Sequence, residues 1–207
     1  MDPKLTVARG YDKIAREYLR QRERKPKDPN RSYLDRLTDG LPDSARVLDL
    51  GCGAGMPYAA YLSERFSVVG VDISRGQLAL AQELVPKASF VRADIAALPL
   101  KPHAFDAIAM LYSVIHVPRE EHESLFRALY ALLTPGGRLF AVVGAQEWEA
   151  RESDWLVEGV EMFWSHFGPD HYLKLLERLG FSLGDSEIVP DPVLEGAHLF
   201  VLAEKPA

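Results

Sequence analysis

Three glycines, Gly51, Gly53 and Gly55, stand at alternate positions directly after a short apolar run. Glycine has no Cβ, so a ligand can lie against the backbone N–H groups that a strand-to-helix turn exposes. A dinucleotide-binding loop reads G-x-G-x-x-G, whereas the sixth position counted from Gly51 is Met56. The spacing therefore predicts a nucleotide-like ligand and departs from the pattern expected for NAD.

Three aspartates accompany this loop at the ends of predicted strands. Asp72 ends the second strand, where a carboxylate can accept hydrogen bonds from both ribose hydroxyls of NAD or of an adenosyl sulfonium. Asp49 precedes the loop and can meet an ammonium group, and Asp94 ends the third strand and can accept from an adenine amino group. Aspartate also favours caps and turns, but three acids at matching strand ends favour a binding site.

The elements that must position these residues alternate between strand-like and helix-like stretches, which is typical of an α/β domain. Right-handed crossovers order the first five strands in parallel. They are predicted at residues 46–50, 67–72, 89–94, from 105 and at 138–144. A helix at 169–180 and strands at 182–190 and 198–205 follow, and the two strands are expected to form an antiparallel hairpin at a sheet edge.

Two segments lie outside this alternation. Residues 1–25 form an amphipathic helix that carries Tyr11 and Tyr18 on its apolar face and ends before Pro26. Residues 146–168 are rich in aromatic and acidic side chains and are expected to be an insertion on the substrate side. We divide the single domain accordingly into the first helix, a cofactor-binding core at 43–145, the insertion, and a closing helix and hairpin at 169–207.

Composition narrows the class of protein. With 207 residues and 47% hydrophobic content, the chain fits one globular domain. Its single cysteine excludes an internal disulfide framework, no Cys/His spacing suggests a metal site, and no apolar run approaches the ~18 residues that span a bilayer. A charged start unlike a secretory signal predicts a cytoplasmic protein. The net charge of −6 combines a basic arm over residues 1–31 with an acidic body; the body argues against a nucleic-acid surface, and the arm leaves open a contact with an anionic partner.

With this loop, these aspartates and this order of elements, the chain resembles the class I S-adenosylmethionine-dependent methyltransferases of the small-molecule type. The stretches VLDLGCGAG, VVGVD, VRADIAALPL, FDAIAMLYSVIHV and LTPGGRLF match the successive motifs of that family in order and spacing. The resemblance implies a Rossmann-like, doubly wound, mainly parallel sheet of seven strands with an antiparallel C-terminal strand, in three α/β/α layers. It also implies S-adenosylmethionine as cofactor, S-adenosylhomocysteine as product, and no metal.

Carried over to this sequence, the resemblance assigns cofactor contacts. It places the three loop glycines and Cys52 under the methionine part of the cofactor, with Asp49 near its amino group and the backbone near Leu111 closing that end. Asp72 would hold the ribose. Further contacts are implied for Ile73, which would pack on the adenine, for Asp94 with Ile95 at the adenine edge, and for Tyr11 and Tyr18 if the first helix is a lid.

The acceptor side is less determined. A sulfonium methyl group is already activated, so its transfer needs in-line alignment more than an acid, a base or a metal. Where the acceptor must lose a proton, His116 and His166 are the candidate catalytic residues, and Tyr112 and Trp164 are candidate substrate contacts. Of the other four histidines, His103, His122 and His198 are expected at solvent or in turns, and His171 is expected at the start of a helix as a neutral or solvent-exposed ring. Packing remains an alternative for every aromatic side chain here.

Several other functions remain to be weighed. Residues 109–112 lack the Asn/Asp-Pro-Pro-aromatic run usual for methylation of base amines, and cytosine C5 methylation would need a cysteine there. A non-catalytic S-adenosylmethionine-binding or regulatory protein is the main alternative, and an NAD-dependent oxidoreductase is disfavoured by Met56. The prediction is methyl transfer to a small-molecule acceptor, whose identity and reacting atom the sequence leaves open, as it does the oligomeric state.

Overall fold

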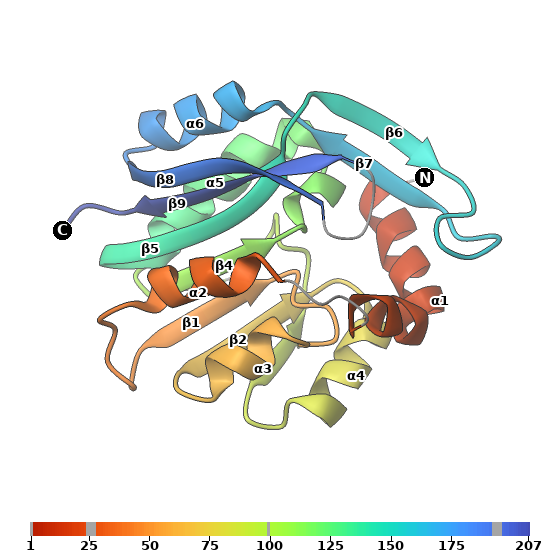
Figure 1. Cartoon of the computed structure of the whole chain (residues 1–207), viewed down its shortest axis with the longest axis horizontal. Helices are drawn as coiled ribbons and strands as arrows, with labels where there is room; N and C mark the ends of the chain where they lie inside the picture. The colour runs from red at the N-terminus through yellow and green to blue at the C-terminus, as the bar shows by residue number, and fades with distance from the viewer. Residues whose placement is uncertain (1, 24–27, 99, 192–195) are drawn as a thin grey trace.

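The computed structural model describes residues 2–23, 28–98, 100–191 and 196–207 (Figure 1). Its centre is a seven-stranded sheet in the order β3-β2-β1-β4-β5-β9-β8, in which only β9 runs opposite to its neighbours. This confirms the predicted fold class and the closing hairpin. The strands are β1 (Arg46–Leu50), β2 (Ser67–Asp72), β3 (Ser89–Arg92), β4 (Phe105–Leu111), β5 (Leu133–Gly144), β8 (Ser182–Pro190) and β9 (Ala197–Glu204).

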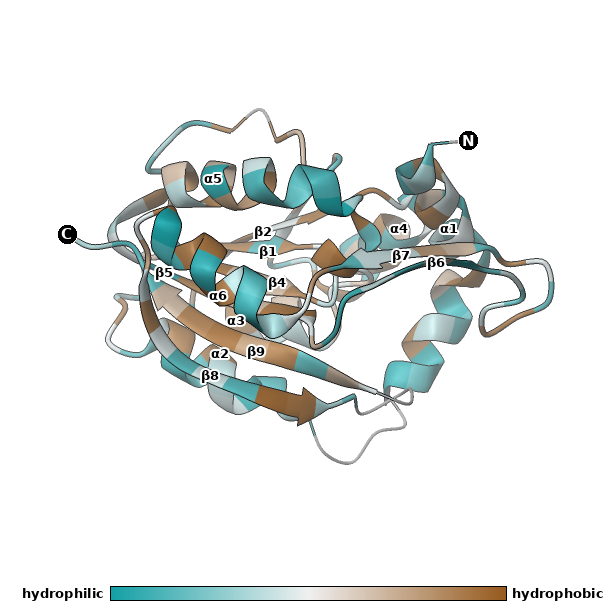
Figure 2. Ribbon diagram, turned by 90° about the horizontal axis from the view of Figure 1, so that it is seen from above, coloured by the Kyte–Doolittle hydropathy of each residue, from teal (hydrophilic) through white to brown (hydrophobic). Residues whose placement is uncertain are grey.

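Helices cover both faces of the sheet because alternate residues of its inner strands point to opposite sides. Val47 of β1 packs in the cluster under α2 and α3, whereas Leu48 and Leu50 pack in the cluster under α5 and α6. In Figure 2 the strand β9 is apolar along most of its length, while α6 alternates between polar and apolar residues. The helices are α2 (Asn30–Thr38), α3 (Tyr58–Ser63), α4 (Arg75–Leu84), α5 (His122–Leu132) and α6 (Pro169–Arg178), with 3-10 turns η1 (Val114–His116) and η2 (Arg119–Glu121).

The predicted N-terminal helix is α1 (Pro3–Glu23), and it lies against the start of α4. Asp12 of α1 accepts hydrogen bonds from the Ser74 hydroxyl (2.6 Å) and the Gly76 backbone N–H (2.8 Å). A carboxylate at the N-terminus of a helix satisfies free N–H groups and interacts favourably with the helix dipole. These bonds fix α1 across the edge of the sheet at which the parallel strands end.

The insertion folds as a second, two-stranded sheet, a structure that its irregular pattern did not predict. Strands β6 (Trp148–Glu152) and β7 (Met162–His166) pair antiparallel, and β7 is buried along its whole length. The hairpin and α1 lie side by side (Figure 1). Gly10 of α1 permits this close contact, because a Cβ at that position would lie only 2.7 Å from the Glu161 carbonyl oxygen. No helix among the described residues is long and apolar enough to cross a membrane.

Candidate functional site

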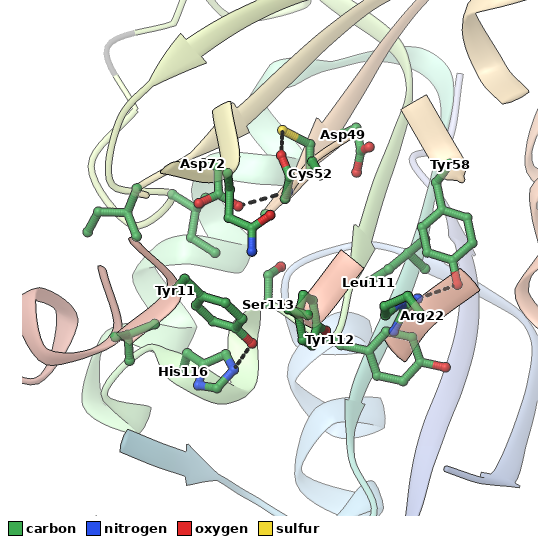
Figure 3. A pocket seen from close by; sticks show the side chains of 18 of the residues that line it. Tyr11, Arg22, Asp49, Cys52, Tyr58, Asp72, Leu111, Tyr112, Ser113 and His116 are labelled. Carbon is green, nitrogen blue, oxygen red and sulfur yellow. Dashed lines mark hydrogen bonds between the residues drawn. The ribbon is translucent and has the colours of Figure 1, made fainter. Parts of the chain in front are cut away.

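A cavity opens at the carboxyl ends of the parallel strands, beneath α1 (Figure 3). In open α/β sheets this edge is where ligands bind, because the loops that leave neighbouring strands diverge there. The cavity brings together most of the side chains and backbone that the sequence predicted for the site. These are Tyr11, Tyr18, Asp49, Gly51, Cys52, Gly53, Asp72, Ile73, Asp94, Ile95, Leu111, Tyr112 and His116.

The glycine loop adopts a backbone that other residues tolerate poorly. Gly51 and Gly53 have φ angles of +73° and +54°, in the left-handed region that favours glycine. A Cβ on Gly51 would lie 2.2 Å from the Ser113 Cβ, so the turn after β4 closes directly onto the loop. Asp72 ties the loop to α4, since its carboxylate accepts from the N–H of Gly53 (2.9 Å) and of Ser74 (2.8 Å).

Two buried polar side chains in the cavity lack partners within the described chain. Asp49 is 2% exposed, and among the described residues its Oδ2 has no hydrogen-bond partner. Burial, together with the nearby charge of Asp72, raises the pKa of Asp49 to about 7. Gln77, in the first turn of α4, is 1% exposed with neither amide atom bonded to a described residue. Because such groups are costly to bury unsatisfied, both fit a polar ligand in this cavity.

The third predicted acid, Asp94, is already engaged. One carboxylate oxygen accepts from the Ala96 backbone N–H (2.9 Å), as in an Asx turn, and the other pairs with Lys4 of α1 at 2.6 Å. Lys4 also contacts Glu121 at 2.7 Å. The same carboxylate thus forms the turn that the sequence allowed as an alternative, lines the cavity, and holds the start of α1 over it.

Tyr11 and His116 form a hydrogen-bonded pair that faces the cavity (Figure 3). The Nδ1 of His116 lies 2.8 Å from the Phe163 carbonyl oxygen, which only accepts, so Nδ1 carries the proton. The neutral Nε2 then accepts from the Tyr11 hydroxyl at 2.9 Å. Burial lowers the pKa of His116 to about 4 and raises the pKa of Tyr11 well above its usual value. At neutral pH the pair is uncharged, and His116 reaches the cavity beside this hydroxyl.

Three predicted site residues do not line the cavity. A Cβ on Gly55 would lie 3.0 Å from Val85 Cγ2, so this glycine serves the packing of the loop against the core. Trp164 and His166 belong to β7, and the His166 Nδ1 donates to the Gln146 carbonyl oxygen at 2.6 Å. Their predicted roles toward an acceptor stay predictions.

His122 corrects another expectation. Predicted at solvent, it is fully buried, with Nε2 2.9 Å from the Val117 carbonyl oxygen and Nδ1 3.1 Å from the Tyr172 hydroxyl. Its charged neighbours in the sequence suggested an exposed position, whereas the side chain is hydrogen-bonded to two buried partners. It is a structural residue of the packing between α5 and α6.

The cavity also contains residues that the sequence reasoning missed, chiefly Lys4, Arg22, Tyr58, Gln77 and Ser113. Arg22 lies one helical turn after Tyr18, and Gln77 lies in the turn that Ser74 caps, so helical spacing from predicted residues could have found both. Lys4 and Ser113 carry no such signal. Among the described residues, no group of three or more His, Cys, Asp or Glu side chains is arranged to hold a metal ion.

Comparison with known proteins agrees with this geometry. Residues 47–137 match the family model described as "Methyltransferase domain". Over 102 residues the chain is 43% identical to a trans-aconitate 2-methyltransferase of Variovorax paradoxus, a match that covers 48% of this chain and 38% of that protein. This chain carries a class I S-adenosylmethionine-dependent methyltransferase domain. The family predicted from the motifs is confirmed.

Solved structures extend the likeness of the methyltransferase domain over nearly the whole chain. The DhpI–SAH complex has a TM-score of 0.70 at 22% identity, covering 97% of this chain and 96% of that one. The [4+2]-cyclase SpnF also has a TM-score of 0.70, at 20% identity, covering 97% and 95%. At this level of identity the structures show the fold alone. The chain spans half or less of the length of the curated relatives it matches.

Proposed function

We propose that this domain binds S-adenosylmethionine in the cavity beneath α1 and transfers its methyl group to a small-molecule acceptor, giving S-adenosylhomocysteine. The observation that carries the proposal is the set of buried polar atoms of Asp49 and Gln77, which lack partners among the described residues and lie beside a glycine loop that admits close approach. A nucleoside joined to an amino acid through sulfur supplies the hydrogen-bonding groups that such a surface needs.

The residues of the chain would divide the work between them. When bound, the cofactor supplies a methyl group on a sulfonium, which is transferred by in-line displacement. Asp72 and Gln77 would bind its polar groups, and the turn from Leu111 to Ser113 would shape the space beside the reacting atoms. Tyr112, within this turn, has a φ of +58°, a strained backbone of the kind that gathers at functional sites, and its ring would contact the acceptor.

We assign roles in this reaction to helix α1 and to the hairpin β6–β7. Helix α1 would act as a lid over the cofactor, and the hairpin β6–β7 would back the acceptor side through Phe163, whose carbonyl holds His116. Where the acceptor loses a proton, the Tyr11 hydroxyl would take it and pass its own proton to Nε2 of His116, whose low pKa makes that protonated state short-lived. A cytoplasmic location and the absence of a nucleic-acid partner stay predictions.

Labelled S-adenosylmethionine and a panel of acceptors test the proposal. The panel contains carboxylic acids, among them trans-aconitate because of the named relative, together with phenols, alcohols and amines. We expect S-adenosylhomocysteine to form only when an acceptor is present, and the Asp72→Ala variant to lose this activity. Cofactor binding without turnover on any acceptor would instead favour the alternative of a non-catalytic S-adenosylmethionine-binding protein.

A further inference from the structure

Trp155 belongs to the connection between β6 and β7, and its indole packs against the inner face of α1. The side chain is 5% exposed, whereas that of Val157, two residues later, is 40% exposed. Its ring centroid lies 5.7 Å from that of Tyr11 and 5.9 Å from that of Tyr18. Both tyrosines line the cavity, and Trp155 lies behind them. The indole is therefore a second layer behind the part of the cavity wall that α1 supplies.

The backbone is strained on both sides of Trp155. Asp154 and Leu156 each have a φ of +61°, a region that is unfavourable for residues that carry a Cβ. The Trp155 carbonyl oxygen accepts from the Val157 N–H at 2.8 Å, which closes a γ-turn around Leu156. The Trp155 N–H donates to the Val160 carbonyl oxygen at 3.0 Å. The connection thus fixes both backbone polar groups of Trp155 and holds its indole in one place.

A second indole continues this layer behind His116. Trp164 of β7 lies 5.6 Å from Trp155 and 4.4 Å from the His116 ring, measured between centroids. The rings of Tyr11 and His116 lie 5.4 Å apart and are joined by the hydrogen bond already described. Each indole therefore packs behind one member of this hydrogen-bonded pair. Because protein interiors are close-packed, Tyr11 and Tyr18 cannot withdraw from the cavity while the Trp155 indole fills the space behind them.

We infer that Trp155 is a specificity-determining residue that limits the size of the acceptor on the Tyr11 side of the cavity, an assignment that rests on the proposed function. In that function the acceptor atom lies against the Tyr11 hydroxyl, so the transferred group lies between the cofactor sulfur and Tyr11. Removal of the indole would leave an apolar space, and an apolar space of about 150 Å³ holds a benzene-sized group. With a smaller side chain at position 155, Tyr11 and Tyr18 would withdraw and the site would accept a bulkier ligand.

Cofactor analogues that differ only in the group on sulfur test the inference without any need for turnover. S-adenosylmethionine carries a methyl group, and its S-benzyl analogue places a ring on the acceptor side, since the adenosine and amino-acid parts are unchanged. We expect wild-type protein to bind the benzyl analogue about 10- to 100-fold more weakly, because overpacking is costly. Trp155→Ala should reduce this ratio of Kd values by about tenfold. Trp155→Leu should give an intermediate ratio, and it keeps the test available if the alanine variant does not fold.

Trp148→Ala is the matched control. Trp148 is 42% exposed, and its ring contacts with Trp164 and His166 lie outside the cavity lining, so the ratio should keep its wild-type value. The inference is overturned if folded Trp155 variants keep the wild-type ratio, or if wild-type protein binds both analogues equally well. An equal change in Trp148→Ala would also overturn it, because the effect would then come from the hairpin as a whole. Wild-type protein that binds neither S-adenosylmethionine nor S-adenosylhomocysteine would instead refute the proposed function.

Discussion

The two sides of the cavity differ in whether their buried polar atoms have hydrogen-bond partners. On the side that we propose for the cofactor, around the glycine loop, Asp49 and Gln77 present buried polar atoms that lack partners in the described chain. On the side that we propose for the acceptor, the Tyr11 hydroxyl and both nitrogens of His116 are hydrogen-bonded within the protein. A polar ligand on the side proposed for the cofactor would therefore supply the missing bonds, whereas the polar groups on the side proposed for the acceptor already have hydrogen-bond partners within the protein.

Replacement of Gly51 by alanine should break the cofactor side most severely. The new Cβ would lie 2.2 Å from the Ser113 Cβ and would force a φ of +73° on alanine. We expect a loss of about 3–5 kcal/mol in the free energy of unfolding, measured with urea, and loss of S-adenosylhomocysteine binding. Gly136→Ala is the matched control, because its φ is +75° with nothing within 4 Å of a Cβ. Equal losses in the two variants would contradict the contact with Ser113.

The pH dependence of the free energy of unfolding tests whether the Asp49 carboxyl titrates as a buried group. Its pKa rises on folding from 3.8 to about 7, so the native state binds the proton more tightly and loses stability as pH rises through that window. Relative to Asp49→Asn, the wild type should lose unfolding free energy on the order of 3 kcal/mol between pH 4 and pH 8. A difference between the two proteins that does not change with pH would show that the Asp49 carboxyl is not titrating as a buried group.

Removal of the Asp72 carboxylate tests the tie between loop and ligand. Asp72→Ala loses the bonds to Gly53 and Ser74 as well as any bond to the ribose, and we expect the affinity for S-adenosylhomocysteine to fall by about 1.5–3 kcal/mol. Isothermal titration calorimetry measures the change. Asp43→Ala serves as control, since that side chain is 81% exposed and pairs at the surface with Arg65. Unchanged affinity for S-adenosylhomocysteine in a folded Asp72→Ala protein would show that the ribose does not bind at Asp72.

We expect the smallest effect from Gln77→Leu, with opposite consequences for the stability of the unliganded protein and for ligand binding. Replacing a buried amide that bonds to no described residue by an apolar group of similar size should leave the unliganded protein as stable or more stable, by up to about 1 kcal/mol. Binding of S-adenosylhomocysteine should weaken by about 1 kcal/mol because the amide bonds to the ligand are lost. Thermal unfolding with and without the ligand measures both. Weaker stability with unchanged binding would make Gln77 a structural residue.

The same contrast explains what could be predicted from the sequence. The loop glycines, Asp49 and Asp72 follow from local rules, because backbone conformation and strand ends leave marks at fixed spacing. The hairpin β6–β7 does not, since its strand pattern is set by packing against α1 and η1 and reads as an irregular aromatic segment. The ion pair that engages Asp94 joins residues far apart in the chain, and local spacing carries no information about it.

Calorimetric titration with S-adenosylhomocysteine and with NAD tests the central claim most directly, namely that the cavity beneath α1 is an adenosyl-amino-acid site. The arrangement of Asp49, Asp72 and Gln77 predicts saturable binding of S-adenosylhomocysteine and no binding of NAD at the same concentrations. Tight binding of NAD with no response to S-adenosylhomocysteine or S-adenosylmethionine would contradict it.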